Sequence, residues 1–384
     1  MGVLVTLSNE PRDYAWGSTT LIAELTGREP SGRPEAEVWL GDHPADPAET
    51  GDGRTLDVWM RLEGADHGAP SQLPYLLKLL AAASALSIQA HPSKAQAEVG
   101  FAREDSAGIA RDAAERTYRD ANHKPELVVA VSDSFRALAG LRDLEATRRL
   151  VASVGAGARA LSERLDRADA SPGAVLRWVL SDEGRAEARA IIDAALSAHS
   201  DEFAAELQVV RELDGVFPGD PGIVVALLMN LVTLRRGEGL FVPAGILHAY
   251  LEGLGVELMA ASDNVLRGGL TPKHIDVAEL LDVLDPTPGP PPILRPERVA
   301  PGLRRFAVPV SDFALFLAEP SDGAAVTLPI HGVAIALATA GEVTVSGDGG
   351  TSESLRPGSA VLATPDEGIL SFEGNGTVFV AVPG

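Results

Sequence analysis

Apolar and polar positions alternate in short blocks over roughly the first 140 residues, with turn residues between the blocks. Blocks of this kind are typical of β-strands. We expect strands at residues 3–7, 37–40, 86–90 and 127–131. Residues 76–85 are almost continuously apolar, and periodicity does not decide there between a helix and a buried strand. The first part of the chain therefore predicts a β-rich domain.

Helical spacing replaces this pattern after Asp143. The following 70 or so residues are rich in Ala, Leu, Arg and Glu, and apolar residues such as Leu150, Val151 and Val154 recur on one helical face. Residues 170–173 break this stretch into separate helices, and residues 223–234 predict a further apolar helix. We interpret residues 141–235 as a helical insertion.

Strand character returns at Gly239. A helix is expected at residues 275–284, with Thr271–Pro272 as its start. Residues 285–292 contain five prolines in eight positions, which predicts an extended linker. Beyond it, short strands alternate with Gly-rich turns, which predicts a small all-β domain.

Composition limits the chemistry of any metal site. The chain has 384 residues and no cysteine, so a metal would need His, carboxylate or amide ligands. No basic stretch followed by an apolar run starts the sequence, and no apolar run is long enough to span a bilayer. These features together favour the cytoplasm.

Charge makes the lysines informative. The formal net charge is −22, a field that repels nucleic acid, anionic membranes and phosphorylated metabolites, so a phosphate site needs a local group of cations. Only four of the 32 basic residues are lysines, namely Lys78, Lys94, Lys124 and Lys273. With so few lysines, their positions could be due to chance, but three of the four lie within the motifs described below.

Three short segments carry candidate metal ligands. Gln89 and His91 lie two residues apart at the end of a predicted strand, so both project from one face. Glu126 follows Asn-His-Lys-Pro directly before an apolar strand, and His248 ends a Pro-x-Gly-x-x-His turn. Each segment alone is more simply a turn or a polar loop. Together they resemble the ligand order of cupin barrels, with Gln89 where many cupins have His. Such a set suits Zn²⁺, with Mn²⁺, Co²⁺ or Fe²⁺ as substitutes.

Six motifs resemble the type I mannose-6-phosphate isomerase family. They are Tyr-Ala-Trp-Gly at 14–17, Ala-Glu-Val-Trp at 36–39, Leu-Pro-Tyr-Leu-Leu-Lys at 73–78, Ser-Ile-Gln-Ala-His-Pro at 87–92, Asn-His-Lys-Pro-Glu at 122–126 and Arg-Gly-Gly-Leu-Thr-Pro-Lys at 267–273. The matches span residues 14–273; Gly268 departs from the family pattern, which often has Ala there. The resemblance implies interconversion of mannose 6-phosphate and fructose 6-phosphate. It also implies one zinc ion per chain, held by Gln89, His91, Glu126 and His248, and a monomeric enzyme.

These patterns predict a mainly β fold with a helical insertion. A cupin-like jelly-roll barrel is expected from residues 1–140 plus 236–284, interrupted by the α-helical domain at 141–235. A Pro-rich linker at 285–295 leads to a second jelly-roll domain at 296–384.

An aldose–ketose isomerase moves a proton between two carbons through an enediol, so it needs a base and a stabiliser of negative charge on oxygen. The resemblance suggests Arg267 as the stabiliser. Candidates for the proton steps are Lys124, His123, Glu257 and Asp263. Asp263 and Arg267, four apart, would share a face if that stretch were a helical turn.

Donors for the phosphate are expected in Ser87, Lys94 and Lys273, because phosphate favours point charges and hydroxyls. For Lys94 a surface charge is nearly as good an explanation. Trp16, Trp39 and Tyr250 are candidate pocket walls, although buried aromatic residues more often belong to a core.

Two other functions remain open. One is a cupin metal oxygenase, against which Gln89 and the Lys and Arg set argue. The other is a non-catalytic sugar-phosphate-binding regulator, which would be expected to have lost a ligand or Arg267.

Overall fold

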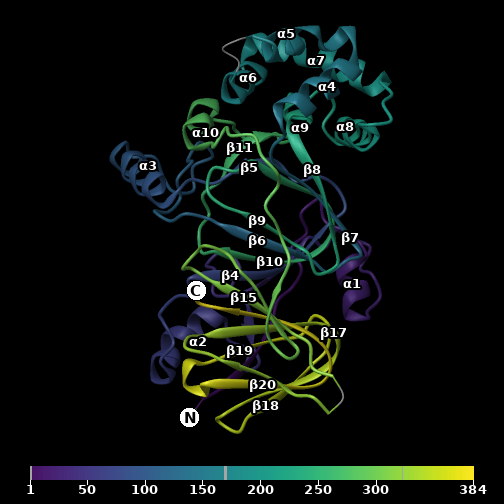
Figure 1. Ribbon diagram of the computed structural model, residues 1–384. Helices are drawn as coiled ribbons and strands as arrows, with labels where there is room; N and C mark the ends of the chain where they lie inside the picture. Colours follow the sequence, from purple (N-terminus) through teal and green to yellow (C-terminus); the bar gives the residue numbers. More distant parts are fainter. Residues whose placement is uncertain (1, 168–170, 322) are drawn as a thin grey trace.

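Strands dominate the fold, and helices gather at one end of it. The computed structural model describes residues 2–167, 171–321 and 323–384. In Figure 1 the C-terminal sheet lies at the bottom, a second sheet lies above it, and a layer of helices covers the top. The mainly β fold with a helical middle stretch is as predicted.

The second sheet carries the segments singled out in the sequence. It has ten strands within the described residues, all paired antiparallel. They are β2 (Glu37–Leu40), β4 (Tyr75–Ala82), β5 (Ile88–Ala90), β6 (Glu126–Ala130), β7 (Ser134–Leu141), β8 (Met229–Arg235), β9 (Gly239–Val242), β10 (His248–Ala260), β11 (Leu266–Gly269) and β12 (Ile293–Leu294). The long strand β10 is the hub, since it pairs with β4, β5, β6 and β7.

The C-terminal sheet also has ten strands in the described chain. They are β1 (Leu4–Ser8), β3 (Glu49–Thr50), β13 (Glu297–Ala300), β14 (Leu303–Phe306), β15 (Ala314–Ala318), β16 (Val326–Pro329), β17 (Ala334–Gly347), β18 (Ser352–Leu355), β19 (Ala360–Ala363) and β20 (Ile369–Val382). Its first two strands come from the other end of the sequence, because β1 pairs with β19 and β3 pairs with β1. The N-terminal segment thus adds two strands at one edge of the C-terminal sheet.

Alternation along the strands builds the core between the two sheets. Leu79 on β4 and Val256 on β10 are buried in it together with Leu315 and Ile335 from the C-terminal sheet. Their neighbours in sequence point to the opposite face of the second sheet, because successive side chains of a strand alternate. That opposite face holds the polar residues described below.

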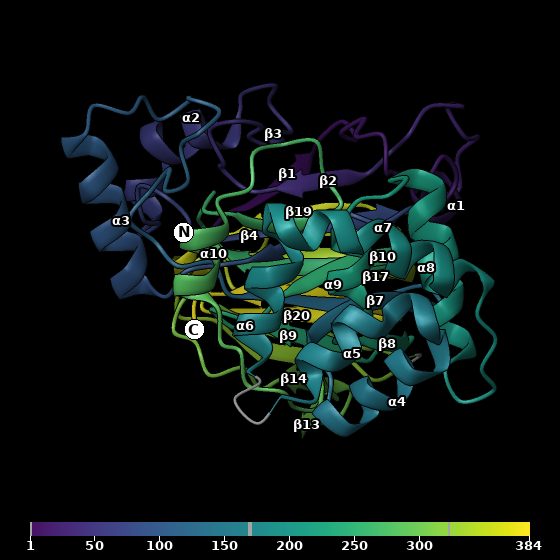
Figure 2. The ribbon, with the colours of Figure 1, turned by 90° about the horizontal axis from the view of Figure 1, so that it is seen from above.

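The helical layer lies over the end of the second sheet near β5 and β11 (Figure 1). Seen from above, its helices lie in front of the strands (Figure 2). Its helices are α4 (Leu144–Val154), α5 (Arg159–Leu165), α6 (Pro172–Val179), α7 (Asp182–Ser197), α8 (Ala204–Val216) and α9 (Gly222–Leu228), with the 3₁₀ turn η2 (Ala156–Ala158). Side chains of Asp143, Ser171 and Ser181 cap α4, α6 and α7 by accepting backbone N–H bonds. Pro172 follows its cap at the first helical position, as the predicted break indicates; Ala170 lies outside the described residues.

The remaining helices flank the sheets: α1 (Leu21–Thr26), α2 (Leu56–Leu62), α3 (Lys94–Ser106), α10 (Val277–Val283), and the 3₁₀ turns η1 (Gly64–His67) and η3 (Pro365–Glu367). Asp276, not Thr271–Pro272, caps the start of α10, so the predicted helix start is wrong by several residues. No helix in the described part of the chain is long and apolar enough to cross a membrane.

One expected helix is wrong over half its length. Residues 223–234 form α9 only as far as Leu228, and β8 begins at Met229 and pairs with β7. An apolar run that is buried throughout satisfies either conformation, and here the free edge of β7 selects the strand. Most of the ambiguous residues 76–85 are resolved in the same way, as strand β4 between β2 and β10, which ends at Ala82. The domain boundaries stay a prediction.

Candidate metal centre

A cavity of about 440 Å³ opens on the face of the second sheet that is turned away from the C-terminal sheet. Strand alternation supplies its polar lining: Lys78 of β4 lies between two core leucines, and Glu257 of β10 lies between Val256 and Leu258. A shift of register in β10 between Tyr250 and Glu252 changes the alternation, so that His248 and Tyr250 line the same cavity as Glu257.

Three buried side chains converge in this cavity. The ligand atoms of His91, Glu126 and His248 all lie within 4.8 Å of one another. Nε2 of His91 is 3.2 Å from Oε1 of Glu126, and Nε2 of His248 is 3.2 Å from Oε2 of the same carboxylate. The three residues come from the end of β5, the start of β6 and the start of β10. His248 pairs with Gln89 of β5, whereas Glu126 pairs with Met259 near the other end of β10, so the fold of the sheet, and not strand pairing alone, brings the carboxylate to the histidines.

Hydrogen bonds determine which nitrogen of each imidazole carries a proton. Nδ1 of His91 lies 2.7 Å from the carbonyl oxygen of Asn264, and Nδ1 of His248 lies 3.1 Å from that of Ile246. A carbonyl only accepts, so each Nδ1 carries the proton and donates it. Burial lowers the pKa of His91 to about 4, so this ring is neutral near pH 7. Nε2 of His91 therefore presents a lone pair to the carboxylate of Glu126.

This arrangement fits a divalent cation. Nε2 of His91 is buried and has no hydrogen-bond partner, although it faces a carboxylate oxygen. A buried lone pair directed at an anion is unfavourable without a positive charge between them. Two imidazole nitrogens and a carboxylate are a ligand set that zinc accepts.

Gln89 stands beside the three. Its backbone is paired with His248 on β10 and with Arg267 on β11, and its side chain lines the cavity. The amide nitrogen donates to the hydroxyl of Ser87 at 3.0 Å, which leaves the amide oxygen as a possible ligand. All four residues expected to hold a metal thus lie in or at one cavity.

Lys124 forms an ion pair with the carboxylate of Glu126. Its Nζ lies 2.8 Å from Oε1 of Glu126, as the spacing of two residues suggested. Burial by itself would raise the pKa of Glu126, but the charge of Lys124 together with the nearby imidazoles outweighs it and holds that pKa well below the ordinary value. Glu126 is therefore an anion in the buried site.

A buried charged group on the neighbouring strands was not predicted. Lys78 Nζ lies 3.1 Å from Glu257 and 3.5 Å from Glu37, and Trp39 Nε1 donates to Glu37 at 2.8 Å. Burial raises the pKa of Glu257, and the Lys78 charge offsets only part of that. The scarcity of lysine had drawn attention to Lys78, and Glu257 was a candidate for the proton steps, but their contact with each other and with Glu37 was not predicted.

Cations without an acidic partner in the described chain also line the cavity. Arg267 and Lys273 line it beside Ser87, and among the described residues neither cation has a carboxylate partner. Burial lowers the pKa of both side chains, with additional contributions from Arg119 to each and from Arg267 to Lys273. Arg119 was not singled out in the sequence. Unpaired cations in a chain of net charge −22 suit an anionic ligand.

Three expected site residues lie outside the cavity lining. Asp263 pairs with His43 at 3.2 Å, and His123 pairs with Asp312 at 2.9 Å. Lys94 donates to Asn122 at 3.0 Å. The residues before β11 are not helical, so the expectation that Asp263 and Arg267 share a helical face is wrong. Trp16 and Tyr250 do line the cavity, whereas Trp39 does not: it contacts the lining residues Glu37, through its Nε1, and Lys78, whose Nζ lies 5.0 Å from the ring centroid.

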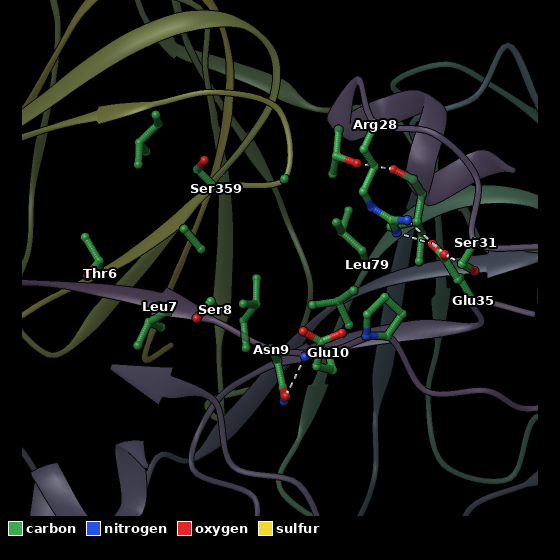
Figure 3. Close-up of a pocket in the computed structure, with 18 of the residues that line it drawn as sticks. Thr6, Leu7, Ser8, Asn9, Glu10, Arg28, Ser31, Glu35, Leu79 and Ser359 are labelled. Atoms are coloured by element: carbon green, nitrogen blue, oxygen red, sulfur yellow. Dashed lines mark hydrogen bonds and ion pairs between the residues drawn. The ribbon is translucent and has the colours of Figure 1, made fainter. Parts of the chain in front are cut away.

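A larger cavity lies elsewhere and lacks this chemistry. It measures about 780 Å³ and is formed by the segments around β1, α1, β2 and β18. Figure 3 shows its main charged contact, in which Arg28 and Glu35 point toward each other and form an ion pair beside Ser31. No group of metal-ligating residues among the described residues lies there, so size does not identify the functional site.

Comparison with known proteins gives a consistent result. A family model described as the catalytic domain of type I phosphomannose isomerase matches residues 4–144. The mannose-6-phosphate isomerase of Escherichia coli strain K12 is 37% identical over 385 residues, which cover 96% of this chain and 97% of that protein. The mannose-6-phosphate isomerase of Bos taurus is 33% identical and covers 88% of each chain.

Solved structures agree over the whole chain. A zinc-bound mannose 6-phosphate isomerase superposes with a TM-score of 0.89 at 34% identity, covering 99% of both chains. The enzyme from Salmonella typhimurium bound to its substrate, fructose 6-phosphate, and to zinc superposes with a TM-score of 0.87 at 34% identity, again covering 99% of both.

Proposed function

This chain belongs to the type I phosphomannose isomerase family, and we propose that it interconverts mannose 6-phosphate and fructose 6-phosphate in the cavity around His91, Glu126 and His248. The observation that carries the proposal is a buried His-Glu-His group at a cavity that is also lined by Arg267 and Lys273, two cations without a carboxylate partner among the described residues. A sugar phosphate needs both features, because its oxygens change charge during isomerisation while its phosphate stays anionic.

Zinc, one ion per chain, is the cofactor that this site suits. Gln89, His91, Glu126 and His248 would hold it through an amide oxygen, two Nε2 atoms and a carboxylate. When bound, zinc supplies positive charge that stabilises a developing oxyanion. The chain itself fixes both histidines in the required tautomer through the carbonyl groups of Asn264 and Ile246.

Proton transfer is assigned to groups that line the cavity. Lys124 is the proposed base, because its Nζ is held at the Glu126 carboxylate beside the metal ligands. Glu257 is the second candidate, since burial raises the pKa of its carboxyl toward the working range of a general base. Asp263 and His123 are engaged in ion pairs away from the cavity lining and are not proposed for this step.

Negative charge on the substrate is balanced by cations that line the same cavity. We assign the phosphate to Lys273 and the hydroxyl of Ser87, and we assign Arg267 to stabilising negative charge near the reacting carbons. Trp16 and Tyr250 contribute walls. Lys94 is bound to Asn122 and keeps no proposed role.

A coupled assay tests the function. Purified zinc-loaded protein is expected to form fructose 6-phosphate from mannose 6-phosphate, to lose that activity with a chelator and to regain it with zinc. Absence of turnover by the zinc-loaded protein would contradict the proposal, and sugar-phosphate binding without turnover would instead support a binding regulator.

Two further properties are proposed on simpler grounds. We propose a monomeric enzyme, since every residue of the site comes from one chain, and sedimentation of the zinc-loaded protein tests this. We also propose a cytoplasmic location, which the cysteine-free composition favours.

A further inference from the structure

Leu270 has an unusual backbone conformation. Its φ is 56°, and it is the one residue other than glycine with positive φ in the described parts of the chain. A side chain with a Cβ adopts this region at a cost, so surrounding contacts must hold it there. Leu270 lies directly after β11, between the two proposed substrate-contacting residues Arg267 and Lys273.

Asp220 supplies the holding contact. Its Oδ1 accepts the N–H of Leu270 at 3.2 Å and also the N–H of Gly222, the first residue of α9, at 2.7 Å. One carboxylate oxygen of the helical layer thus bonds the loop that follows β11. Two hydrogen bonds to one anionic acceptor are stronger than bonds to a neutral group.

Close backbone approach strengthens the same junction. A Cβ on Gly222 would lie 2.7 Å from the Cα of Gly269, so the two backbone segments are in direct contact, with no side chain between them. The junction is therefore tight at Gly222, Gly269 and Leu270, where all three residues are buried.

Beyond the junction the loop has little support. Thr271 and Lys273 line the cavity of the metal centre, and they also line a second cavity of about 490 Å³ that includes Leu180 and Arg185 of the helical layer. A segment with space on both sides gains little from packing. Its position must then be determined mainly at its base.

We propose that Asp220 is a positioning residue for the substrate: it fixes the loop after β11 so that Lys273 meets the phosphate. The inference deepens the proposed function and rests on it. Asp220 touches no metal ligand and does not line the metal-centre cavity, so the effect acts through Leu270 and the loop.

The test compares Asp220→Ala, Asp220→Asn and the control Asp143→Ala. The Asn amide oxygen can still accept both N–H groups, whereas Ala cannot. Asp143 caps α4 by accepting the N–H of Ala146 at 3.0 Å, so its replacement removes a similar bond far from the loop. Steady-state rates with mannose 6-phosphate are measured together with inhibition by inorganic phosphate.

Asp220→Ala is expected to raise KM for mannose 6-phosphate and the inhibition constant of phosphate by about tenfold each, with kcat changed less. Asp220→Asn is expected to retain wild-type values within about twofold, and Asp143→Ala is expected to leave KM unchanged. Equal KM in all three variants, with only a lowered melting temperature in the Ala variants, overturns the inference. Wild-type protein without isomerase activity contradicts the proposed function instead, while a weakened phosphate affinity in Asp220→Ala still supports the positioning role.

Discussion

Lys78 and Glu257 face each other across β4 and β10, and their charged groups lie 3.1 Å apart in the buried lining of the metal-centre cavity. Glu37 approaches the same ammonium from β2 at 3.5 Å. Burial alone would lower the pKa of Lys78, but the charges of Glu37 and Glu257 raise it above its ordinary value. Lys78 thus neutralises two carboxylates that share a region of low exposure.

Replacing Lys78 by Met is expected to lower the free energy of unfolding by about 3 kcal/mol, because two buried carboxylates lose their counter-charge. Urea denaturation of the zinc-loaded protein measures this. The double variant Lys78→Met with Glu257→Gln should recover part of the loss, since one of the uncompensated charges is gone. A single variant as stable as wild type would contradict this account.

Metal retention should depend on His91 and not on histidine in general. His91→Ala removes a buried ligand, and elemental analysis after dialysis is expected to show zinc reduced to less than about a tenth of an equivalent, with activity lost in parallel. The matched control is His43→Ala, which removes the partner of Asp263 outside the cavity. Zinc retained at full occupancy in His91→Ala would show that the metal lies elsewhere.

Substrate affinity should fall at alkaline pH through Lys273. Burial and the charges of Arg267 and Arg119 lower the pKa of Lys273 below its ordinary value of 10.5. Its ammonium is lost as pH rises through this lowered pKa, so kcat/KM should decline earlier than for an ordinary lysine. The pH–rate profile of Lys273→Arg supplies the comparison, because a guanidinium stays charged over this range. An identical alkaline limb in both proteins would exclude Lys273 as its origin.

Tyr75 joins the two sheets. Its hydroxyl lies 2.9 Å from the carbonyl oxygen of Val333 and 3.1 Å from that of Ala381, both in the C-terminal part of the chain. Tyr75→Phe leaves these buried carbonyls without this donor and is expected to cost about 1–2 kcal/mol of stability. KM and kcat should stay at wild-type values, because Tyr75 points away from the metal-centre cavity. Denaturation and steady-state rates of the same preparation measure both effects.

The local pattern predicted much of the fold. Alternation and turn residues located β1, β2, β5 and β6 closely, and helical spacing located the helical layer from α4 onward. The same alternation explains why Gln89 and His91, two apart, belong to one site. The ligand types of the metal centre could also be predicted, because few residue types bind zinc and the chain lacks cysteine.

The positions of other polar residues could not be predicted from the sequence. Lys94, His123 and Asp263 have the right chemistry and lie near the motifs, yet each finds a partner away from the cavity lining. Lys78 and Asp220 act through neighbours brought from other strands or helices, and nothing in their local sequence specifies those neighbours.

The sequence by itself determined most of the strands, most of the helices and the side chains that can bind a metal, because these properties depend on residues close in the chain. Tertiary structure decided that residues 229–235 form a strand, that β1 joins the C-terminal sheet, and that Leu270 keeps a strained backbone. In each case the deciding hydrogen bonds come from residues distant in sequence: β7 for β8, β19 for β1 and Asp220 for Leu270. Such bonds outweigh local preference because a buried N–H or C=O without a partner costs more than an unfavourable conformation of one residue.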